Sequence, residues 1–255
     1  MSAPTVAQLK AAHKAVQGGL WGPVGNRMVW EPEAPVVVVV GAGGGVGATT
    51  FALALAEIAE QGRLVECTTP ACSGLVEAST AELGIVERGW RRGTRGQTRL
   101  DRAPREAQSP LSVPLPSLAP AGTTLEVLDL GWDMSCVEGT DTWMEDTLQR
   151  AHARVVVATA TVPSLRRAEL ALASCDVPAV VAVSGAPLKK WPRGLRLAMG
   201  PHTTDLAEQG LLAEIPQDRG LATDGLTPEP LPQRLLAVAH DSLRILPGRD
   251  EGDAA

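Results

Sequence analysis

Tyrosine is absent from this 255-residue sequence, which excludes reductases that depend on a tyrosine–lysine pair. Four cysteines are too few for a disulfide framework in a chain of this length, and they lack the spacing and nearby histidines of a zinc site. No apolar run approaches the roughly 18 residues of a membrane span, and the N-terminus lacks the apolar core of a secretory signal. We therefore expect a cytoplasmic protein without a membrane partner.

Charge is unevenly distributed along the chain. The formal net charge is −6, yet residues 88–105 carry +6, so the remainder carries −12. This basic segment contains one acid and seven arginines: Arg88, Arg91, Arg92, Arg95, Arg99, Arg102 and Arg105. It could bind DNA phosphates without sequence preference, or it could be a mobile, solvated loop that pairs with the protein's own acids. The acidic remainder favours the second alternative.

Predicted strands alternate with predicted helices. The run of five valines at 36–40 is typical of a strand buried on both faces, and further strands are predicted at 63–66, 124–130, 154–161, 178–185 and 212–215. Helices are predicted at 5–18, 47–61, 74–88, 164–174 and 231–246. This alternation predicts an α/β fold, with a doubly wound, mostly parallel sheet and helices on both faces.

Three parts are predicted along the chain. Residues 1–34 form an N-terminal helix followed by an arm rich in Trp, Gly and Pro. Residues 35–246 form a single α/β domain, interrupted by an irregular insertion at 88–122 that is rich in Arg and then in Pro. Residues 247–255 form an acidic, flexible tail.

A glycine-rich turn, "GAGGGVGATT" at 41–50, joins the first predicted strand to the first helix of the domain. In a doubly wound sheet this turn is the usual phosphate site. Its glycines let backbone amides curl around an anion, and the helix N-terminus adds unpaired N–H groups. Thr49 and Thr50 add hydroxyl groups at the same end of the helix. The turn is therefore predicted to bind phosphate.

Two ligand classes fit the turn. Gly43, Gly45 and Ala48 match a relaxed dinucleotide fingerprint, and Glu66 ends the next strand where a ribose-binding acid would lie. The phosphate-loop pattern of nucleoside triphosphatases is degraded, because Ala48 stands where its lysine belongs, although Gly47 and Thr49 are in place. Taken alone, the turn slightly favours a dinucleotide.

Several segments, in order over residues 35–245, resemble the ParA/MinD family of P-loop ATPases, and most closely its CpaE/TadZ-like branch. They are "GAGGGVGATT", "LEVLDLG", "VVVATATVPSLRRAELAL" and "LLAEIPQDRGLATDG". The resemblance implies ATP or ADP bound with magnesium, the metal held by Thr49 and Asp129. It places these residues at the nucleotide: Gly43, Gly44, Gly45, Val46, Gly47, Ala48, Thr49, Thr50, Ser184 and Pro216.

The departures from this family pattern concern charge. Its two loop lysines would fall at Gly43 and Ala48, and its water-orienting aspartate falls in a stretch where this chain has threonines at 68 and 69. Glu66 is the remaining candidate for that carboxylate. Hydrolysis would then require a replacement cation, for which Arg219 or an arginine of residues 88–105 is a candidate.

We therefore expect weak nucleotide binding and little or no ATP turnover. The resemblance implies a scaffold or positioning protein, either a homodimer or bound to an unidentified protein partner. It would serve a plasmid-partition, DNA-transfer (conjugation) or secretion assembly. The alternatives are an NAD(P)-binding Rossmann oxidoreductase and a pseudo-ATPase that acts only through protein contacts.

Overall fold

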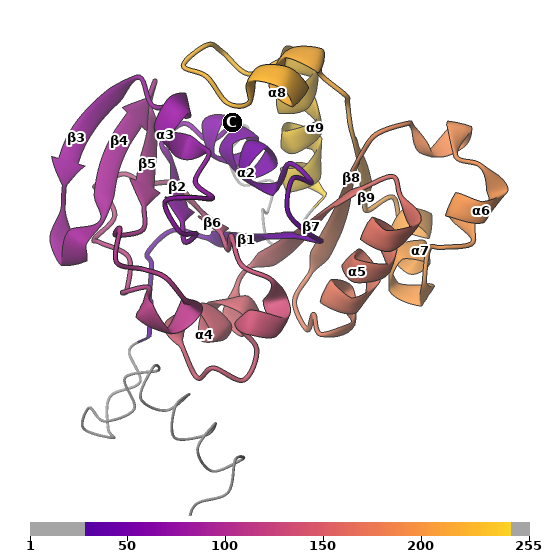
Figure 1. The fold of residues 1–255 in the computed structure, drawn as a ribbon, viewed down its shortest axis with the longest axis horizontal. Coiled ribbons are helices and arrows are strands. Elements are labelled where there is room, and N and C mark those ends of the chain that lie inside the picture. Colours follow the sequence, from indigo (N-terminus) through magenta and orange to yellow (C-terminus); the bar gives the residue numbers. More distant parts are fainter. Residues whose placement is uncertain (1–28, 246–255) are drawn as a thin grey trace, which may run out of the picture.

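The computed structural model describes residues 29–245, which form an α/β fold around a nine-stranded sheet (Figure 1). The strand order is β3-β4-β5-β2-β6-β1-β7-β8-β9. All neighbouring pairs are parallel except β3–β4 and β4–β5, which are antiparallel. The predicted fold class is confirmed. The strands are β1 (Val36–Gly41), β2 (Gly62–Glu66), β3 (Ala81–Ile85), β4 (Arg91–Arg95), β5 (Thr98–Arg102), β6 (Leu125–Asp129), β7 (Ala153–Thr159), β8 (Ala179–Ser184) and β9 (Leu212–Ile215).

Helices cover both faces of the sheet. One face packs against α2 (Ala48–Glu57), α3 (Leu75–Ala78), α8 (Arg219–Asp224) and α9 (Gln233–Arg244). The other packs against α4 (Trp143–Arg150), α5 (Val162–Ala173), α6 (Arg193–Arg196) and α7 (Pro201–Glu208). Short 3₁₀ turns lie at Glu87–Gly89, Pro110–Ser112, Met134–Cys136 and Leu188–Lys190. In this part of the chain no helix has both the length and the apolar character that crossing a membrane requires.

The central strand β1 has a core on each side. Val37 and Val39 belong to the core under α2 and α9, whereas Val36, Val38 and Val40 belong to the core under α4 and α5. Side chains alternate between the two faces of a strand, so an uninterrupted valine run requires apolar partners on both faces. This arrangement explains why the run predicted the strand correctly.

The structure predicted for two segments is wrong. Residues 74–88 are not one helix, because α3 ends at Ala78 and the chain continues into β3. Residues 88–122 are not irregular throughout, because β4 and β5 form a hairpin across Gly96 and Gln97, and Gly96 adopts a positive φ of 56°. The predicted helix at 5–18 and the tail at 247–255 lie outside the described residues.

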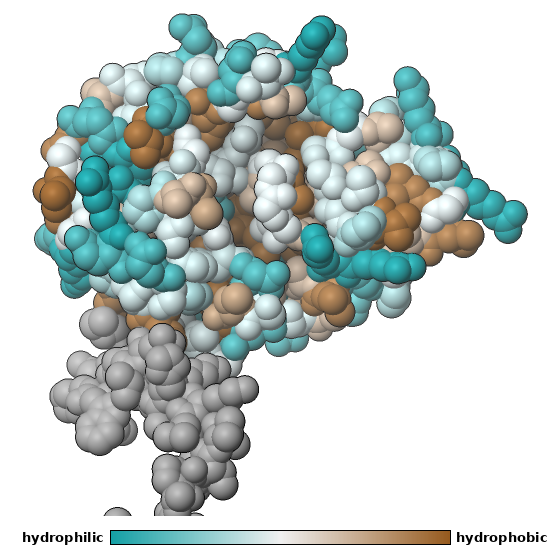
Figure 2. Space-filling model, viewed as in Figure 1, coloured by the Kyte–Doolittle hydropathy of each residue, from teal (hydrophilic) through white to brown (hydrophobic). Residues whose placement is uncertain are grey.

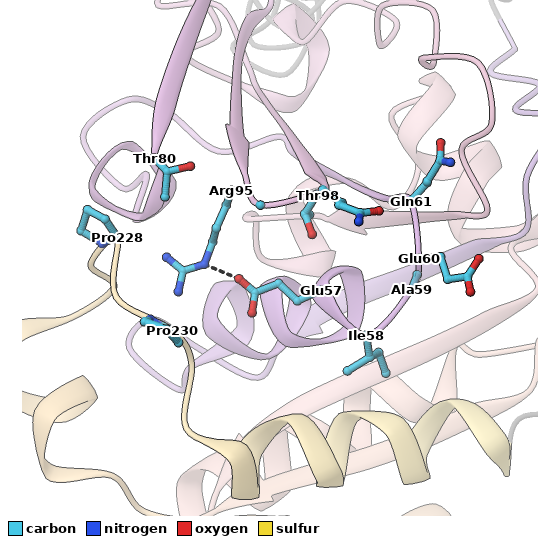
Figure 3. A pocket seen from close by; sticks show the side chains of 12 residues that line it. Glu57, Ile58, Ala59, Glu60, Gln61, Thr80, Arg95, Thr98, Pro228 and Pro230 are labelled. Atoms are coloured by element: carbon cyan, nitrogen blue, oxygen red, sulfur yellow. Dashed lines mark hydrogen bonds and ion pairs between the residues drawn. The ribbon is translucent and has the colours of Figure 1, made fainter.

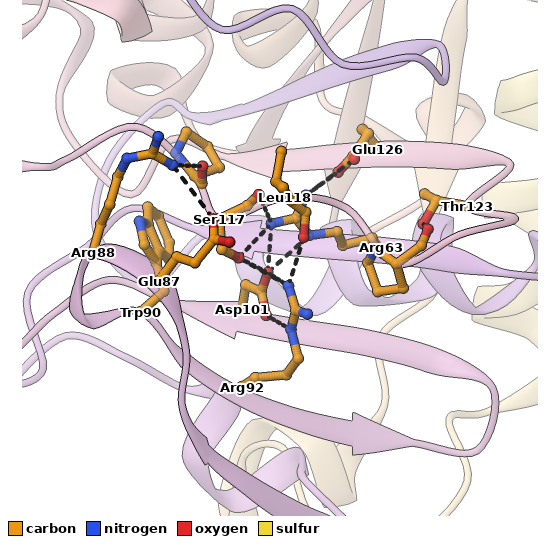
Figure 4. Close-up of polar contacts among 12 residues, drawn as sticks. Arg63, Glu87, Arg88, Trp90, Arg92, Asp101, Ser117, Leu118, Thr123 and Glu126 are labelled. Carbon is orange, nitrogen blue, oxygen red and sulfur yellow. Dashed lines mark hydrogen bonds and ion pairs between the residues drawn. The ribbon is translucent and has the colours of Figure 1, made fainter.

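An ionic cluster holds this hairpin to the sheet (Figure 4). The carboxylate of Asp101, in β5, lies between two guanidinium groups and is completely buried. Arg63 in β2 donates from Nε at 2.8 Å, and Arg92 in β4 donates from Nε at 2.7 Å. Ser117 donates to the same carboxylate at 3.0 Å, and Arg63 also bonds Glu126 in β6 at 3.1 Å. Four adjacent strands are thus linked through buried charges.

Most of the other arginines of the basic segment also contact the protein itself. Arg95 pairs with Glu57 and donates to the backbone oxygen of Ala78, and Arg102 pairs with Glu82. The expectation of a mobile, solvated loop is therefore wrong, while pairing with the protein's own acids occurs at Arg92, Arg95 and Arg102. Within residues 29–245, the guanidinium groups of Arg99 and Arg105 make no hydrogen bond or ion pair.

The edge strand β3 is exposed along its whole length. Leu83 is 56% exposed and Ile85 is 77% exposed, and Figure 2 shows apolar residues at the margin of the molecule where β3 lies. This margin contrasts with the buried strands at the centre of the sheet.

Replacing Asp101 with alanine should destabilise the fold by about 3–5 kcal/mol, because Arg63 would remain buried and lose a main counter-charge. Urea unfolding at pH 7 measures the loss. The matched control is Arg105→Ala in the same segment, which should change the free energy of unfolding by less than about 0.5 kcal/mol. Equal effects of the two substitutions would show that the buried cluster does not stabilise the hairpin.

Candidate functional site

The loop between β1 and α2 presents free backbone donors. Gly45 and Gly47 have φ values of 72° and 92°, a region that residues with a Cβ seldom adopt. Gly47 is the N-cap of α2 and no side chain caps it. Within the described residues, the N–H groups of Ala48, Thr49 and Thr50 donate no hydrogen bond. The positive end of the helix and its free N–H groups therefore face outward, an arrangement that suits a phosphate.

Asp129, the last residue of β6, lies beside this loop. The Thr49 hydroxyl donates a 2.5 Å hydrogen bond to Asp129 Oδ2. The other carboxylate oxygen, Oδ1, is buried and has no hydrogen-bond partner in residues 29–245. Burial raises the pKa of Asp129 to about 6, and the hydrogen bond from Thr49 and the nearby backbone N–H of Gly131 oppose this shift. At pH 7 most of the Asp129 carboxyl group is therefore ionised, and within residues 29–245 it forms no ion pair.

These two residues suit a magnesium ion. Magnesium binds through oxygen ligands, often one or two carboxylates together with phosphate oxygens. A buried carboxylate oxygen without a partner is costly, and a cation would compensate it. No group of three or more His, Cys, Asp or Glu side chains in the described ranges could form a separate metal cluster. Thr49 and Asp129 are accordingly the residues that would hold the metal.

Glu66, the last residue of β2, lies next to Asp129 in register and is fully buried. Its oxygens accept hydrogen bonds from the Ser73 hydroxyl at 2.5 Å and from the N–H of Gly74 at 3.2 Å. Burial raises its pKa to about 8, and the charge of Asp129 adds to the shift. At pH 7 this carboxyl group is protonated, so it is suited neither to orient water as a base nor to reach a ribose.

The segment after β2 supplies no other acid. Thr68 is buried, and its hydroxyl donates to the backbone oxygen of Gly131 at 3.2 Å. The water-orienting carboxylate that the sequence analysis sought therefore has no counterpart between Glu66 and Ser73.

Ser184 and Pro216 lie at the same edge of the sheet as the loop. Ser184 ends β8, and its hydroxyl is 3.5 Å from the backbone oxygen of Val46. It pairs in register with Ile215 of β9, and Pro216 follows directly. The structure thus brings the loop, Asp129, Ser184 and Pro216 to the carboxyl ends of neighbouring strands.

Arg167 is a residue near the loop that the sequence analysis did not assign. It lies on α5, and a Cβ added to Gly43 would be 3.1 Å from its Nη1 atom. Only spatial proximity identifies it, because 124 positions of sequence separate the two residues.

Two surface hollows of about 640 Å³ each lie away from the loop. One is bordered by the C-terminal end of α2 and by Pro228 and Pro230, and Arg95 reaches across it to Glu57 (Figure 3). The other lies along β3, where Arg91, Arg102 and Arg105 line it. Neither hollow contains a residue of the 41–50 loop.

No protein-family model matches the sequence, and no curated protein matches it. Solved structures do match. A ParA family ATPase from Chlorobium tepidum TLS has a TM-score of 0.53 and 15% identity, covering 82% of this chain and 98% of that one. The cell division ATPase MinD of Pyrococcus furiosus has a TM-score of 0.51 and 15% identity, and the match covers 83% of this chain and 99% of that one. A putative plasmid partition protein from Borrelia burgdorferi B31, bound to AMPPNP, has a TM-score of 0.52 and 10% identity, and the match covers 83% of this chain and 97% of that one.

The chain has the ParA/MinD-type ATPase fold. At identities of 10–15% the likeness shows the fold alone. It agrees with the sheet and with the position of the loop, whereas the chemistry of the loop has to be argued from this chain's own residues.

Glu66 should make the stability of the protein depend on pH. In the native state the Glu66 carboxyl group keeps its proton up to about pH 8, whereas in the unfolded state it loses the proton near pH 4.5. The free energy of unfolding therefore falls as pH rises between these values. Between pH 6 and 8, with EDTA present, the loss should be on the order of 1 kcal/mol per pH unit.

Urea unfolding at pH 6, 7 and 8 measures this slope. The Glu66→Gln variant should lose most of it, while Glu60→Gln, at an exposed position, should keep the wild-type slope. An unchanged slope in Glu66→Gln would show that this carboxyl group is ionised in the native state at pH 7.

Proposed function

We propose that the protein is a ParA/MinD-type nucleotide-binding scaffold of the CpaE/TadZ-like branch. It binds ATP or ADP with magnesium weakly and hydrolyses ATP little or not at all. The observation that carries the proposal is the buried, unpartnered oxygen of Asp129 beside Thr49, at the end of a loop whose N–H groups are free. A phosphate-bound cation would satisfy that oxygen, and the free N–H groups would take the phosphates.

Weak binding follows from the residues at the lysine positions. A charge-assisted hydrogen bond contributes about 1.5–3 kcal/mol, so a loop without its lysine at position 48 loses roughly ten- to a hundredfold in affinity. The backbone donors of the loop and the start of α2 do not depend on side-chain identity and remain available. Binding is therefore weakened but retained.

Low turnover follows from what catalysis would need. Phosphoryl transfer is accelerated mainly by positioning and by stabilising the charge that develops on the phosphoryl oxygens. Magnesium, when bound, supplies part of that stabilisation. The loop itself offers no cation, and Glu66 is protonated and held by Ser73 and Gly74, so no ionised carboxylate is available there to position water.

The cellular role proposed here is to position a plasmid-partition, DNA-transfer or secretion assembly, with the protein acting as a homodimer or through a protein partner. Two of the similar structures are a plasmid partition protein and a cell division ATPase, which supports a positioning role. Direct DNA binding through Arg88–Arg105 receives less support, because Arg92, Arg95 and Arg102 are committed to acids of the protein itself.

An NAD(P)-dependent oxidoreductase is not favoured. In that class the acid at the end of the second strand bonds the ribose. Here that acid is Glu66, which is fully buried and bonded to Ser73 and Gly74, so a cofactor cannot reach it without displacing that segment.

The first test concerns the class of ligand. Calorimetry should detect saturable binding of ATP–Mg and ADP–Mg with dissociation constants between micromolar and millimolar, and none for NAD or NADP. Asp129→Asn should remove the magnesium dependence, because it removes the charge that holds the metal. Binding of NAD without ATP would overturn the proposal, and binding of no nucleotide would favour the pseudo-ATPase alternative.

The second test concerns turnover. Phosphate release from ATP should be the same for the wild-type protein as for the Thr49→Ala and Asp129→Asn variants, because no ionised carboxylate is available to position the attacking water. A malachite-green assay with and without magnesium measures it. Magnesium-dependent release that both substitutions abolish would show that the protein is an active ATPase.

A further inference from the structure

A positive charge lies at the phosphate loop although the loop contains no basic residue. Positions 43 and 48 are Gly and Ala. The guanidinium group of Arg167 lies directly beside the first of them, since a Cβ on Gly43 would be 3.1 Å from Nη1. The absence of a side chain at position 43 leaves room for this group.

The pairing of β7 with β1 places the start of α5, the helix that carries Arg167, near the phosphate loop. β7 pairs with β1, with Val157 opposite Gly41, so the turn into α5 begins at the same edge of the sheet as the phosphate loop. The hydroxyl of Ser164 accepts a 2.9 Å hydrogen bond from the N–H of Thr159, which anchors the first turn of α5. Arg167 follows three residues later on the same helix.

The donors of Arg167 are available for a ligand. The side chain is exposed, and within residues 29–245 it makes no hydrogen bond or ion pair. Its charge contributes to lowering the pKa of Asp133, after the hydrogen bonds from Ser135, so the guanidinium also lies within electrostatic reach of the segment after β6. A guanidinium carries five N–H donors in a fork that matches phosphate oxygens.

We propose that Arg167 binds the phosphate chain of the ligand held by the 41–50 loop. It thereby supplies from α5 the positive charge that the loop lacks. This inference rests on the proposed nucleotide site and names the cation of that site. The loop amides would bind the phosphates together with the guanidinium group that lies beside Gly43.

If Arg167 binds phosphate, its contribution to affinity should depend on the number of phosphate groups in the ligand. The contribution of Arg167 should be large for ligands with two or three phosphates and absent for adenosine, because the guanidinium contacts phosphate oxygens alone. A structural role of Arg167 would affect all ligands and the melting temperature alike.

Calorimetry with the full-length protein tests the proposal, using ATP–Mg, pyrophosphate–Mg and adenosine as probes. Arg167→Ala should weaken binding of ATP and pyrophosphate by about 10- to 100-fold and leave the melting temperature unchanged. Arg167→Lys should recover part of the affinity, because the charge returns without the fork. The matched control is Arg166→Ala, at a position on the same helix that is also exposed, and this variant should bind as the wild-type protein does.

Each outcome decides a separate point. Equal affinity of Arg167→Ala and wild type for ATP and pyrophosphate overturns the inference, as does an equal loss in Arg166→Ala. Pyrophosphate binding that depends on Arg167, without ATP binding, supports the inference and overturns the proposed nucleotide function. Binding of neither probe by the wild-type protein overturns both.

Discussion

The valine run of β1 imposes the constraint on which the rest of the structure depends. Each fully buried valine side chain contributes about 1.5–3 kcal/mol, and β1 exposes none of its five valines to solvent. Such a strand is stable only between two helical layers, one with α2 and α9 and the other with α4 and α5. With both faces covered, polar groups that must meet a ligand are left at the carboxyl ends of the strands, where the loop, Asp129 and Ser184 lie.

The parts of the fold that apolar residues stabilise could be predicted from the sequence. The valine-rich strands β1, β7 and β8 were predicted correctly, because burial on both faces leaves a continuous apolar run. The strand β3 was missed because residues 74–88 were predicted as one helix. The strands β4 and β5 were missed because arginine and acid side chains, whose partners lie elsewhere in the chain, give them no apolar pattern. Asp101 and Arg63 are 38 residues apart, and neither residue alone indicates that the pair is buried.

In the candidate site, too, the features set by neighbouring residues could be predicted, whereas the features set by residues far apart in the chain could not. The loop and Thr49 could be proposed from sequence patterns, because they lie at a fixed place between a strand and a helix, whereas Asp129 was proposed from the family resemblance of its strand. Two features depend on which residues meet in the folded protein. One is the protonated state of Glu66, which depends on burial and on Ser73, Gly74 and Asp129. The other is the position of Arg167 beside Gly43. A glycine at position 43 looks like a loss of function in the sequence, whereas in the fold it makes room for another cation.

The buried cluster around Asp101 limits how the protein could be shortened. Arg63 and Glu126 belong to β2 and β6 at the centre of the sheet, whereas Asp101 and Arg92 belong to the hairpin added beside them. Excising the hairpin would leave the Arg63 guanidinium among core residues with Glu126 as its remaining charge partner in the described part of the chain. A minimal version of this domain would need apolar residues at positions 63 and 126 as well as the deletion, because Glu126 is also fully buried and pairs with Arg63, so the hairpin and the central sheet are one unit for protein engineering.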